Sequence, residues 1–459
     1  MDRFLAAAKG GIASIPAESW ATILRNFSID HEATWALGPV CGLNNKQAMV
    51  RVVLQLLHHT VEANGMQMSR ALALEVEAEA LLAARILLRE RQGAEILMND
   101  EALGLYVKAA KEDGDAASGH RVSLMALKCL NNAIWDQPAG QTAFVHLGGL
   151  DMLVALLKAS RPALVLYFSC RILNVVGTSK KSAFAELRKS EDLLELLLSV
   201  LACCVRSTYP AFPWGEGRVP LLVQVLQGLF LLSARLTQEE RETALAGNTM
   251  KRLGYVLIDA LHLDHADMEV FNAKLQVLNL LLDMPDGFVE VLLEHGCLTR
   301  IVQVVELQLT RQAFQDGGDV DAAVGLTPAL LVLNKMVLAS EASRVAVKNA
   351  IFPPQDDEVW RRRLEQEKEE LAAATGDAHL RADKAMRDNR VHPVDAPRGS
   401  LRARLMKQMT ATESSSKTAA CDLLFNLCSD EEEFTTRCGF GNAVNTLRLK
   451  GKISVPGIG

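Results

Sequence analysis

Apolar residues recur at helical spacing along nearly all of this 459-residue chain, and that periodicity restricts the folds open to it. Residues three and four positions apart share one face of a helix, so each such run predicts an amphipathic helix. No convincing series of alternating strands bounded by turn pairs is found. The runs span 45–64, 69–91, 119–135, 149–158, 163–176, 191–206, 218–235, 249–263, 269–284, 297–310, 327–339 and 414–428.

Composition supports the same interpretation. Aromatic residues make up only 5% of the chain, while hydrophobic residues make up 49%, and Leu and Ala dominate them. Leu and Ala enter helices at little entropic cost, whereas β-rich folds depend on aromatic and β-branched residues. Helix after helix with short links, over this length, predicts an all-α armadillo/HEAT-type helical-repeat superhelix, that is, a solenoid.

Two segments resemble each other and indicate the repeat. They are His146–Leu157 and Glu294–Val305, and each has a Gly, then an apolar residue, then an amphipathic helix. Such a Gly ends one helix and the next helix carries its apolar stripe into a shared core. Weaker copies are expected to start near Leu193 and Met250.

The repeat pattern suggests four segments. Residues 1–354 are expected to form an armadillo-like repeat array. Residues 355–400 are dense in charge and are interpreted as an insertion or connector. Residues 401–450 are expected to be C-terminal helical repeats that continue the solenoid, and residues 451–459 a tail.

Charge and cysteine usage bear on location. The net charge of −6 and the pI near 6.0 argue against a nucleic-acid binder, which is usually strongly basic. Nine scattered cysteines without a framework spacing indicate reduced thiols. The N-terminus lacks the apolar core of a signal peptide, and no uncharged apolar run approaches the length of a membrane span. We therefore expect a cytoplasmic protein.

Catalytic motifs are not found. Gly177–Ser182 lacks the Gly-Lys-Ser/Thr of a P-loop, and there is no nucleophile elbow, HExxH motif or paired CxxC. The segment His262–Asp267 is favoured as a polar helix end over a metal site, because no partner cluster is evident. We expect no catalytic residue, no metal and no cofactor.

A few cations inside apolar stretches are candidate binding residues. Arg85 and Arg89 are four apart, as are Arg344 and Lys348, so each pair shares one helix face. Arg171 lies within the run YFSCRILNVV. A charge in an apolar stretch is costly unless it is paired or exposed in a groove. These cations therefore meet a ligand segment in the groove of the solenoid or lie on ordinary solvated helix edges, and the pattern alone favours the second.

Ser429 has two interpretations. It precedes Asp-Glu-Glu-Glu, so it is a candidate phosphorylation site for a kinase that favours acidic surroundings. Ser429 with Glu432 three residues later also fits a capping box at the start of a helix, and this interpretation is favoured.

The C-terminal region carries a resemblance to a known family. The helix Leu401–Thr410 is basic and apolar and ends in Met-Thr, the next helix reads Ala-Ala-Cys-Asp-Leu-Leu-Phe-Asn-Leu-Cys, and a Gly-Phe-Gly-Asn-Ala turn follows it. This order resembles the synembryn ("resistance to inhibitors of cholinesterase") family of exchange factors for G-protein alpha subunits. Phe440 stands where that family usually has Tyr.

Other stretches resemble the same family in the same order. They are Ala84–Arg89, Leu127–Asn132, Asn279–Pro285 and Ser343–Lys348 followed by Pro353-Pro354, so that the match is collinear from about residue 80 to 447. No single motif is specific, and the shared order is the argument.

The resemblance implies a function and a set of contacts. It implies an armadillo-like protein that takes the C-terminal helix of an alpha subunit, GDP-bound or nucleotide-free, into a concave groove, promotes GDP release and acts as a folding chaperone. Binding the open subunit more tightly than the GDP-bound one would accelerate GDP loss without covalent chemistry. The chain is expected to be a monomer. By resemblance the groove would be lined by Arg85, Arg89, Asn132, Arg344 and Lys348, with Arg402 and Arg404 on a later surface.

A different class of function is a generic armadillo scaffold or adaptor for another protein partner. Grooves of that kind often carry ladders of Asn and Trp at repeat spacing. The five Trp residues of this chain form no regular ladder, which counts against the scaffold.

Overall fold

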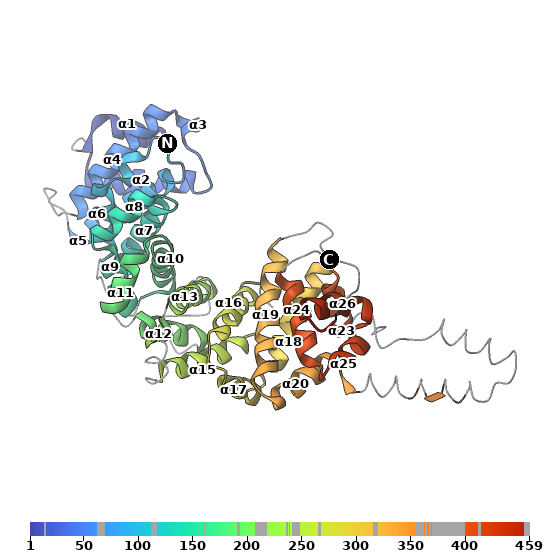
Figure 1. Cartoon of the computed structure of the whole chain (residues 1–459). Coiled ribbons are helices and arrows are strands. Elements are labelled where there is room, and N and C mark those ends of the chain that lie inside the picture. Colours follow the sequence, from blue (N-terminus) through green and yellow to red (C-terminus); the bar gives the residue numbers. More distant parts are fainter. Residues whose placement is uncertain are drawn as a thin grey trace. The chain divides into compact units, whose positions relative to one another are not determined.

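The computed structural model describes residues 1–459 except 13–14, 62–68, 112–116, 160, 191–192, 207–217, 236, 238, 241–247, 265–267, 315–319, 355–361, 363–364, 367–368, 370–399, 412–414 and 454–459. Within these described residues every regular element is a helix and none is a strand (Figure 1). The all-α helical-repeat prediction is therefore confirmed. The predicted charged segment 355–400, apart from Ser400 and a few isolated positions, and most of the predicted tail lie outside the described residues.

The chain divides into two compact units, Met1–Arg241 and Glu242–Gly459. In the first unit two rows of helices pack back to back. One row is α2, α5, α7, α10 and α13, each packed on the next, and the other is α1, α4, α6, α9 and α12. The helices are α1 (Asp2–Gly10), α2 (Ala17–His31), α3 (Gly38–Cys41), α4 (Leu43–Val61), α5 (Arg70–Leu87), α6 (Asp100–Ala110), α7 (Ala117–Ile134), α8 (Pro138–His146), α9 (Gly149–Lys158), α10 (Ala163–Ser179), α11 (Lys181–Ser190), α12 (Leu193–Arg206) and α13 (Arg218–Ser233), with a 3₁₀ helix at Glu95–Met98.

The second unit repeats the arrangement. One row is α15, α18 and α23, the other is α16, α19 and α24, and the two rows join through the pairs α15–α16, α18–α19 and α23–α24. Shorter helices bridge successive pairs. The helices are α15 (Thr249–Leu261), α16 (Met268–Leu282), α17 (Phe288–Glu294), α18 (Cys297–Phe314), α19 (Val320–Ala339), α20 (Glu341–Ile351), α23 (Leu401–Met409), α24 (Ser415–Leu427), α25 (Glu431–Cys438) and α26 (Phe440–Leu449).

A left-handed residue marks the repeat. Gly148 has φ 74° between α8 and α9, and Gly296 has φ 69° between α17 and α18, as the two similar segments predicted. Asn248 takes the same place before α15 with φ 65°. Gly pays no steric cost at positive φ, and Asn is among the residues that tolerate it best. A helix also begins at each of the two predicted weaker copies, α12 at Leu193 and α15 at Thr249, one residue before the predicted Met250.

Each predicted run coincides with a helix, and the differences are at the ends. The largest is in α19, which begins at Val320 instead of residue 327, so that Pro328 lies inside the helix. Neither α2 nor α6 was covered by a predicted run, and both bury one face in the core of the first unit. The C-terminal end of α2 contacts the C-terminal part of α5 through Glu32 and Arg85.

Candidate functional site

The row α5, α7, α10 and α13 exposes one polar face in the first unit. The residues that remain accessible recur every three or four positions, while those between them are buried against the other row. Amides and cations occupy this face near the C-terminal half of each helix. They are Arg85 on α5 and Arg89 just after it, Asn131 and Asn132 on α7, Arg171 and Asn174 on α10, and Gln224 and Gln227 on α13.

Arg171 is held by neutral groups. Its Nε donates to Asn131 Oδ1 at 2.9 Å and its Nη1 donates to the Tyr167 hydroxyl at 3.0 Å. Its guanidinium lies over the Trp135 ring, 5.1 Å from the centroid, in cation–π geometry. No carboxylate of the described residues forms an ion pair with Arg171. The cation is therefore oriented but not neutralised.

A cavity opens beside Arg171. It has a volume of about 580 Å³ and lies between α7, α10 and α13. Asn174 crosses from α10 to α13, with its Nδ2 donating to Gln224 O at 2.8 Å. The Oδ1 of Asn174 is buried without a hydrogen-bond partner. The lining residues are Trp135, Asp136, Arg171, Asn174, Val175, Thr178, Gln224 and Gln227.

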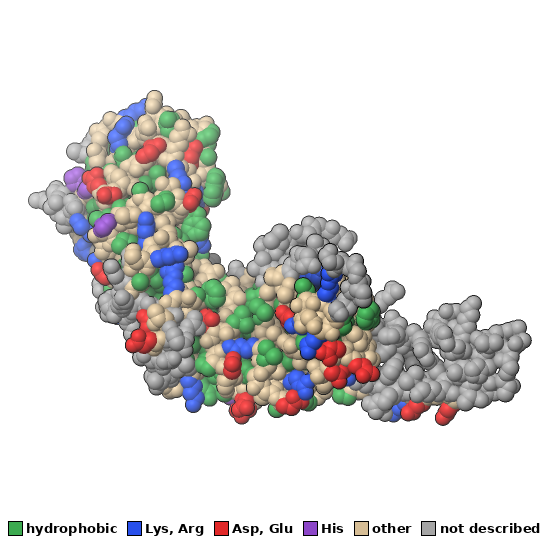
Figure 2. All heavy atoms as spheres, in the orientation of Figure 1, with side chains coloured by type: hydrophobic (Ala, Val, Ile, Leu, Met, Phe, Trp, Pro, Cys, Tyr) green, Lys and Arg blue, Asp and Glu red, His purple; other side chains and the backbone are tan. Residues whose placement is uncertain are grey.

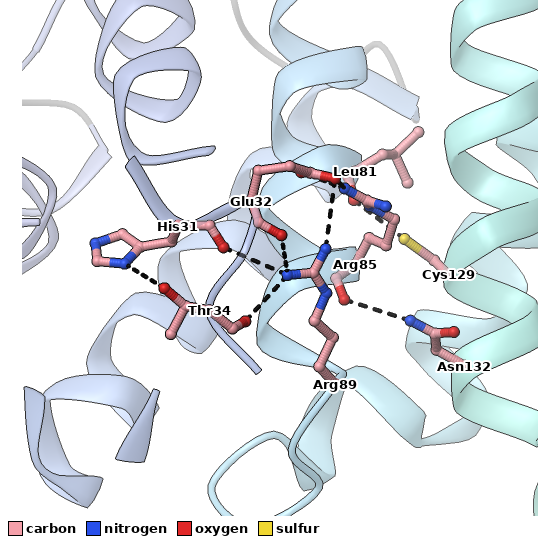
Figure 3. A network of polar contacts seen from close by, with 8 residues as sticks. All are labelled: His31, Glu32, Thr34, Leu81, Arg85, Arg89, Cys129 and Asn132. Atoms are coloured by element: carbon pink, nitrogen blue, oxygen red, sulfur yellow. Dashed lines mark hydrogen bonds and ion pairs between the residues drawn. The ribbon is translucent and has the colours of Figure 1, made fainter. Parts of the chain in front are cut away.

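Arg85 and Arg89 both reach the C-terminal end of α2 (Figure 3). Arg85 Nη2 donates to both carboxylate oxygens of Glu32, at 2.6 and 2.5 Å. Arg89 Nη1 donates to three backbone carbonyls, those of His31 at 3.3 Å, Glu32 at 2.5 Å and Thr34 at 3.0 Å. Burial, followed by the like charge of Arg85, lowers the pKa of Arg89 from its usual value. These two cations thus have partners within the chain.

Asn132 lies next to this network. Its Nδ2 donates to Arg85 O at 3.4 Å, and in the same helix pair Cys129 Sγ donates to Leu81 O at 3.1 Å (Figure 3). Burial raises the pKa of the Cys129 thiol, so the thiol stays protonated and acts as a packing group. The structure therefore brings four predicted residues of the first unit, Arg85, Arg89, Asn132 and Arg171, to adjacent helices of one row.

In the second unit, the four predicted cations contact groups of their own unit. Arg344 makes two hydrogen bonds of 2.8 Å to Glu341 in the same helix, while Lys348 pairs with Glu433 at 2.7 Å. Arg344 and Glu341 line a second cavity with Asn426 and Ser429.

Arg402 and Arg404 join α23 to its neighbours. Arg402 Nη2 donates to Arg437 O at 2.8 Å, and its guanidinium lies 5.2 Å from the centroid of the Phe352 ring. Arg404 Nη1 donates to Thr310 Oγ1 at 2.5 Å and to Glu306 O at 3.3 Å, which connects α23 to α18. Both arginines therefore hold α23 against neighbouring helices of the second unit.

The capping box near Ser429 is shifted by one residue from the prediction. Asp430 is the N-cap of α25, and its Oδ1 accepts from Glu433 N at 2.7 Å. Glu433 Oε2 in turn accepts from Ser429 N at 2.8 Å. The favoured pairing of Ser429 with Glu432 is therefore wrong, because Asp at the following position takes the cap. Ser429 itself is exposed, and its phosphorylation stays a prediction.

Sequence reasoning missed a set of amides. Asn279, Asn334 and Asn426 lie at corresponding places on α16, α19 and α24, and Asn426 Nδ2 donates to Asn334 Oδ1 at 2.9 Å. The signal was an Asn or Gln directly after an apolar residue in α7, α10 and α13 of the first unit and in α16, α19 and α24 of the second. It is visible at Leu130-Asn131, Leu173-Asn174, Leu226-Gln227, Leu278-Asn279, Leu333-Asn334 and Phe425-Asn426.

Among the described residues, no group of three His, Cys, Asp or Glu side chains is placed to hold a metal ion. His262 is the C-cap of α15, and its Nε2 lies 2.9 Å from His295 O; residues 265–267 of that predicted segment are outside the described ones. No single helix in the described ranges has the length and apolar character to cross a membrane, and one bent pair, α8 with α9, passes that test jointly. On the face drawn in Figure 2, acidic and basic side chains are interspersed over both units.

Fold and site together define a class, a helical-repeat protein with amide and cationic groups along one row of helices. The model of the family described as guanine nucleotide exchange factor synembryn matches residues 80–373, and the chain belongs to this family. No curated protein matches the chain. Among solved structures, a crystal structure of an engineered protein is similar to it with a TM-score of 0.45 and 14% sequence identity, over 94% of each chain.

Proposed function

We propose that this chain is an exchange factor and folding chaperone for G-protein alpha subunits, and that the C-terminal helix of the subunit binds on the face formed by α7, α10 and α13. The observation that carries the proposal is Arg171. It is a cation without an ion-pair partner among the described residues, and it borders a cavity whose lining includes the amides Asn174, Gln224 and Gln227 and one acid, Asp136. Arg presents forked donors that suit a carboxylate, and the amides can pair with polar groups of a bound helix.

The proposed mechanism is differential binding. A protein that binds the open, nucleotide-free subunit more tightly than the GDP-bound one shifts that equilibrium and accelerates GDP loss. The same hold on a partly open subunit would assist its folding. In this proposal the chain needs no catalytic residue, metal or cofactor, and it acts in the cytoplasm as a monomer.

The test is the rate of GDP release from a purified alpha subunit with increasing amounts of this protein. We expect a dose-dependent acceleration that Arg171→Glu reduces at least about tenfold, because the substitution places a carboxylate where the ligand's would lie, and charged pairs are worth more than 1.4 kcal/mol when partly desolvated. Arg51→Glu is the matched control, since Arg51 is exposed on α4, in the other row. Equal activity of the two variants would refute the placement of the site.

The amides on successive helices, such as Asn131, Asn174 and Gln227, also favour a second candidate, a scaffold that binds an extended peptide of another protein. Amides at corresponding positions of successive helices can pair with a peptide backbone of any sequence. This candidate predicts a complex with no effect on GDP release. Formation of a complex on a sizing column together with an accelerated release rate would exclude it as the main function.

A further inference from the structure

Arg85 and Arg89 were both predicted to line the groove, but their contacts differ. Arg89 donates only to backbone carbonyls at the end of α2, apart from a 3.5 Å approach to Glu32 Oε1. The carbonyls of His31 and of the C-cap Glu32 are among those that a helix end leaves without an intrahelical partner, and Thr34 follows two residues later. Arg89 therefore caps the C-terminus of α2.

The same device recurs in other repeats. Arg235 Nη1, just after α13, donates to Gly177 O of α10 at 2.6 Å. Lys335 Nζ, on α19, donates to Leu282 O at the end of α16 at 2.8 Å and also to Met284 O. In all three cases a cation caps the preceding helix of the same row. Arg89 therefore has a structural role that recurs in other repeats of the chain.

Arg85 does not follow the pattern. Its side-chain hydrogen bonds go to the carboxylate of Glu32, and both come from Nη2. Its Nε is buried without a hydrogen-bond partner. Glu32 therefore contacts only Nη2 of the two nitrogens, Nε and Nη2, on that edge of the guanidinium (Figure 3). A bidentate carboxylate on an arginine would use two nitrogens.

Glu32 is also placed unfavourably for its own helix. It is the C-cap residue of α2, where the helix dipole disfavours a negative charge. Its side chain is 57% exposed, whereas that of Arg85 is 16% exposed. The carboxylate can therefore swing into solvent without opening the core, and Arg89 would still hold the end of α2.

From this geometry we infer that Glu32 is an internal competitor: its carboxylate occupies Arg85 in the free protein and must leave before Arg85 binds a carboxylate of the partner. The inference rests on the proposed function for the identity of that partner. Glu32 lies outside residues 80–373, the part of the chain that the family model matches.

The first test needs no partner. Phenylglyoxal modifies accessible guanidinium groups, and peptide mass spectrometry reports the rate at each arginine. In Glu32→Gln we expect faster modification of Arg85 and an unchanged rate at Arg89, which keeps its carbonyl contacts. Asp30→Asn is the matched control, because Asp30 is an exposed acid two residues earlier on α2. An unchanged rate at Arg85 would overturn the competition.

The second test measures affinity for a purified GDP-bound alpha subunit by biolayer interferometry. An exposed ion pair contributes about 0.2–1 kcal/mol, so its loss should tighten binding by roughly 1.4- to 5-fold in Glu32→Gln. Asp30→Asn should match wild type, and the gain should vanish when Arg85→Ala is added to Glu32→Gln. Wild-type binding without a gain in Glu32→Gln would overturn this inference alone, whereas absence of binding by every variant would overturn the proposed function as well.

Discussion

Replacing Arg89 with Ala should loosen the end of α2 far more than replacing Arg85 with Ala. The Arg89 guanidinium satisfies three carbonyls, and the contacts to His31 O and Thr34 O are partly buried. Water can replace the exposed contact to Glu32 O, and His31 O keeps its hydrogen bond from Thr34 N at 3.0 Å, whereas Thr34 O would lose its partly buried donor. Because that donor is charged, the free energy of local opening should fall by about 2–3 kcal/mol.

The assay is hydrogen exchange measured by mass spectrometry on peptides from α2, because a long repeat chain need not unfold in one step. A loss of 2–3 kcal/mol corresponds to exchange faster by roughly 30- to 150-fold at the end of α2. In Arg85→Ala the lost contact is an ion pair to a largely exposed carboxylate, so the acceleration should stay below about fivefold. Arg235→Ala is a second control, which should act on α10 and leave α2 unchanged. Equal exchange rates in Arg85→Ala and Arg89→Ala would refute the conclusion that Arg89 caps α2 whereas Arg85 does not.

Two further predictions concern the second unit. Gly254→Ala would place a Cβ well inside van der Waals contact with the ring of Phe288, so it should destabilise the unit by about 1–3 kcal/mol, measured as a lower midpoint of thermal unfolding, and Phe288→Leu should restore part of the loss. Burial acts to raise the pKa of Glu433, but hydrogen bonds from Lys348, the Ser429 N–H and Arg437 outweigh it and bring the pKa to about 2. Since the folded-state pKa lies below the unfolded value near 4.3, the stability from Glu433 is fully present above about pH 5 and is lost as the pH falls toward 2. Unfolding midpoints measured from pH 6 to pH 2.5 should show this loss in wild type and a smaller one in Glu433→Gln.

Helix positions were largely predictable because the signal is local. An apolar stripe at period 3.6 depends on residues within one turn or two, and Gly148 and Gly296 identify the repeat through a backbone requirement that only a few residue types meet. Helix ends were less predictable. Asp430 takes the cap instead of Ser429, although both have residue types suited to it.

The residue types of the candidate site were predictable, but their roles were not. Arg85, Arg89 and Arg171 all read as cations within apolar stretches. Their difference lies in partners far away along the chain, Glu32 and the end of α2 for the first two, and Asn131 with Trp135 for the third. The five Trp residues form no regular ladder, whereas an amide follows an apolar residue in α7, α10 and α13 and again in α16, α19 and α24.

The sequence by itself determined the class of fold, the register of the repeat and, through collinear motifs, the family to which the chain belongs. These follow from periodicity, from left-handed positions and from the order of short segments, all of which are properties of neighbouring residues. Only the tertiary structure decided which partners these cations have among the described residues: a carboxylate for Arg85, backbone carbonyls for Arg89 and neutral side chains for Arg171. That decision depends on contacts between successive helices of a row, such as Arg85 with Glu32, which packing brings together across more than fifty residues of chain.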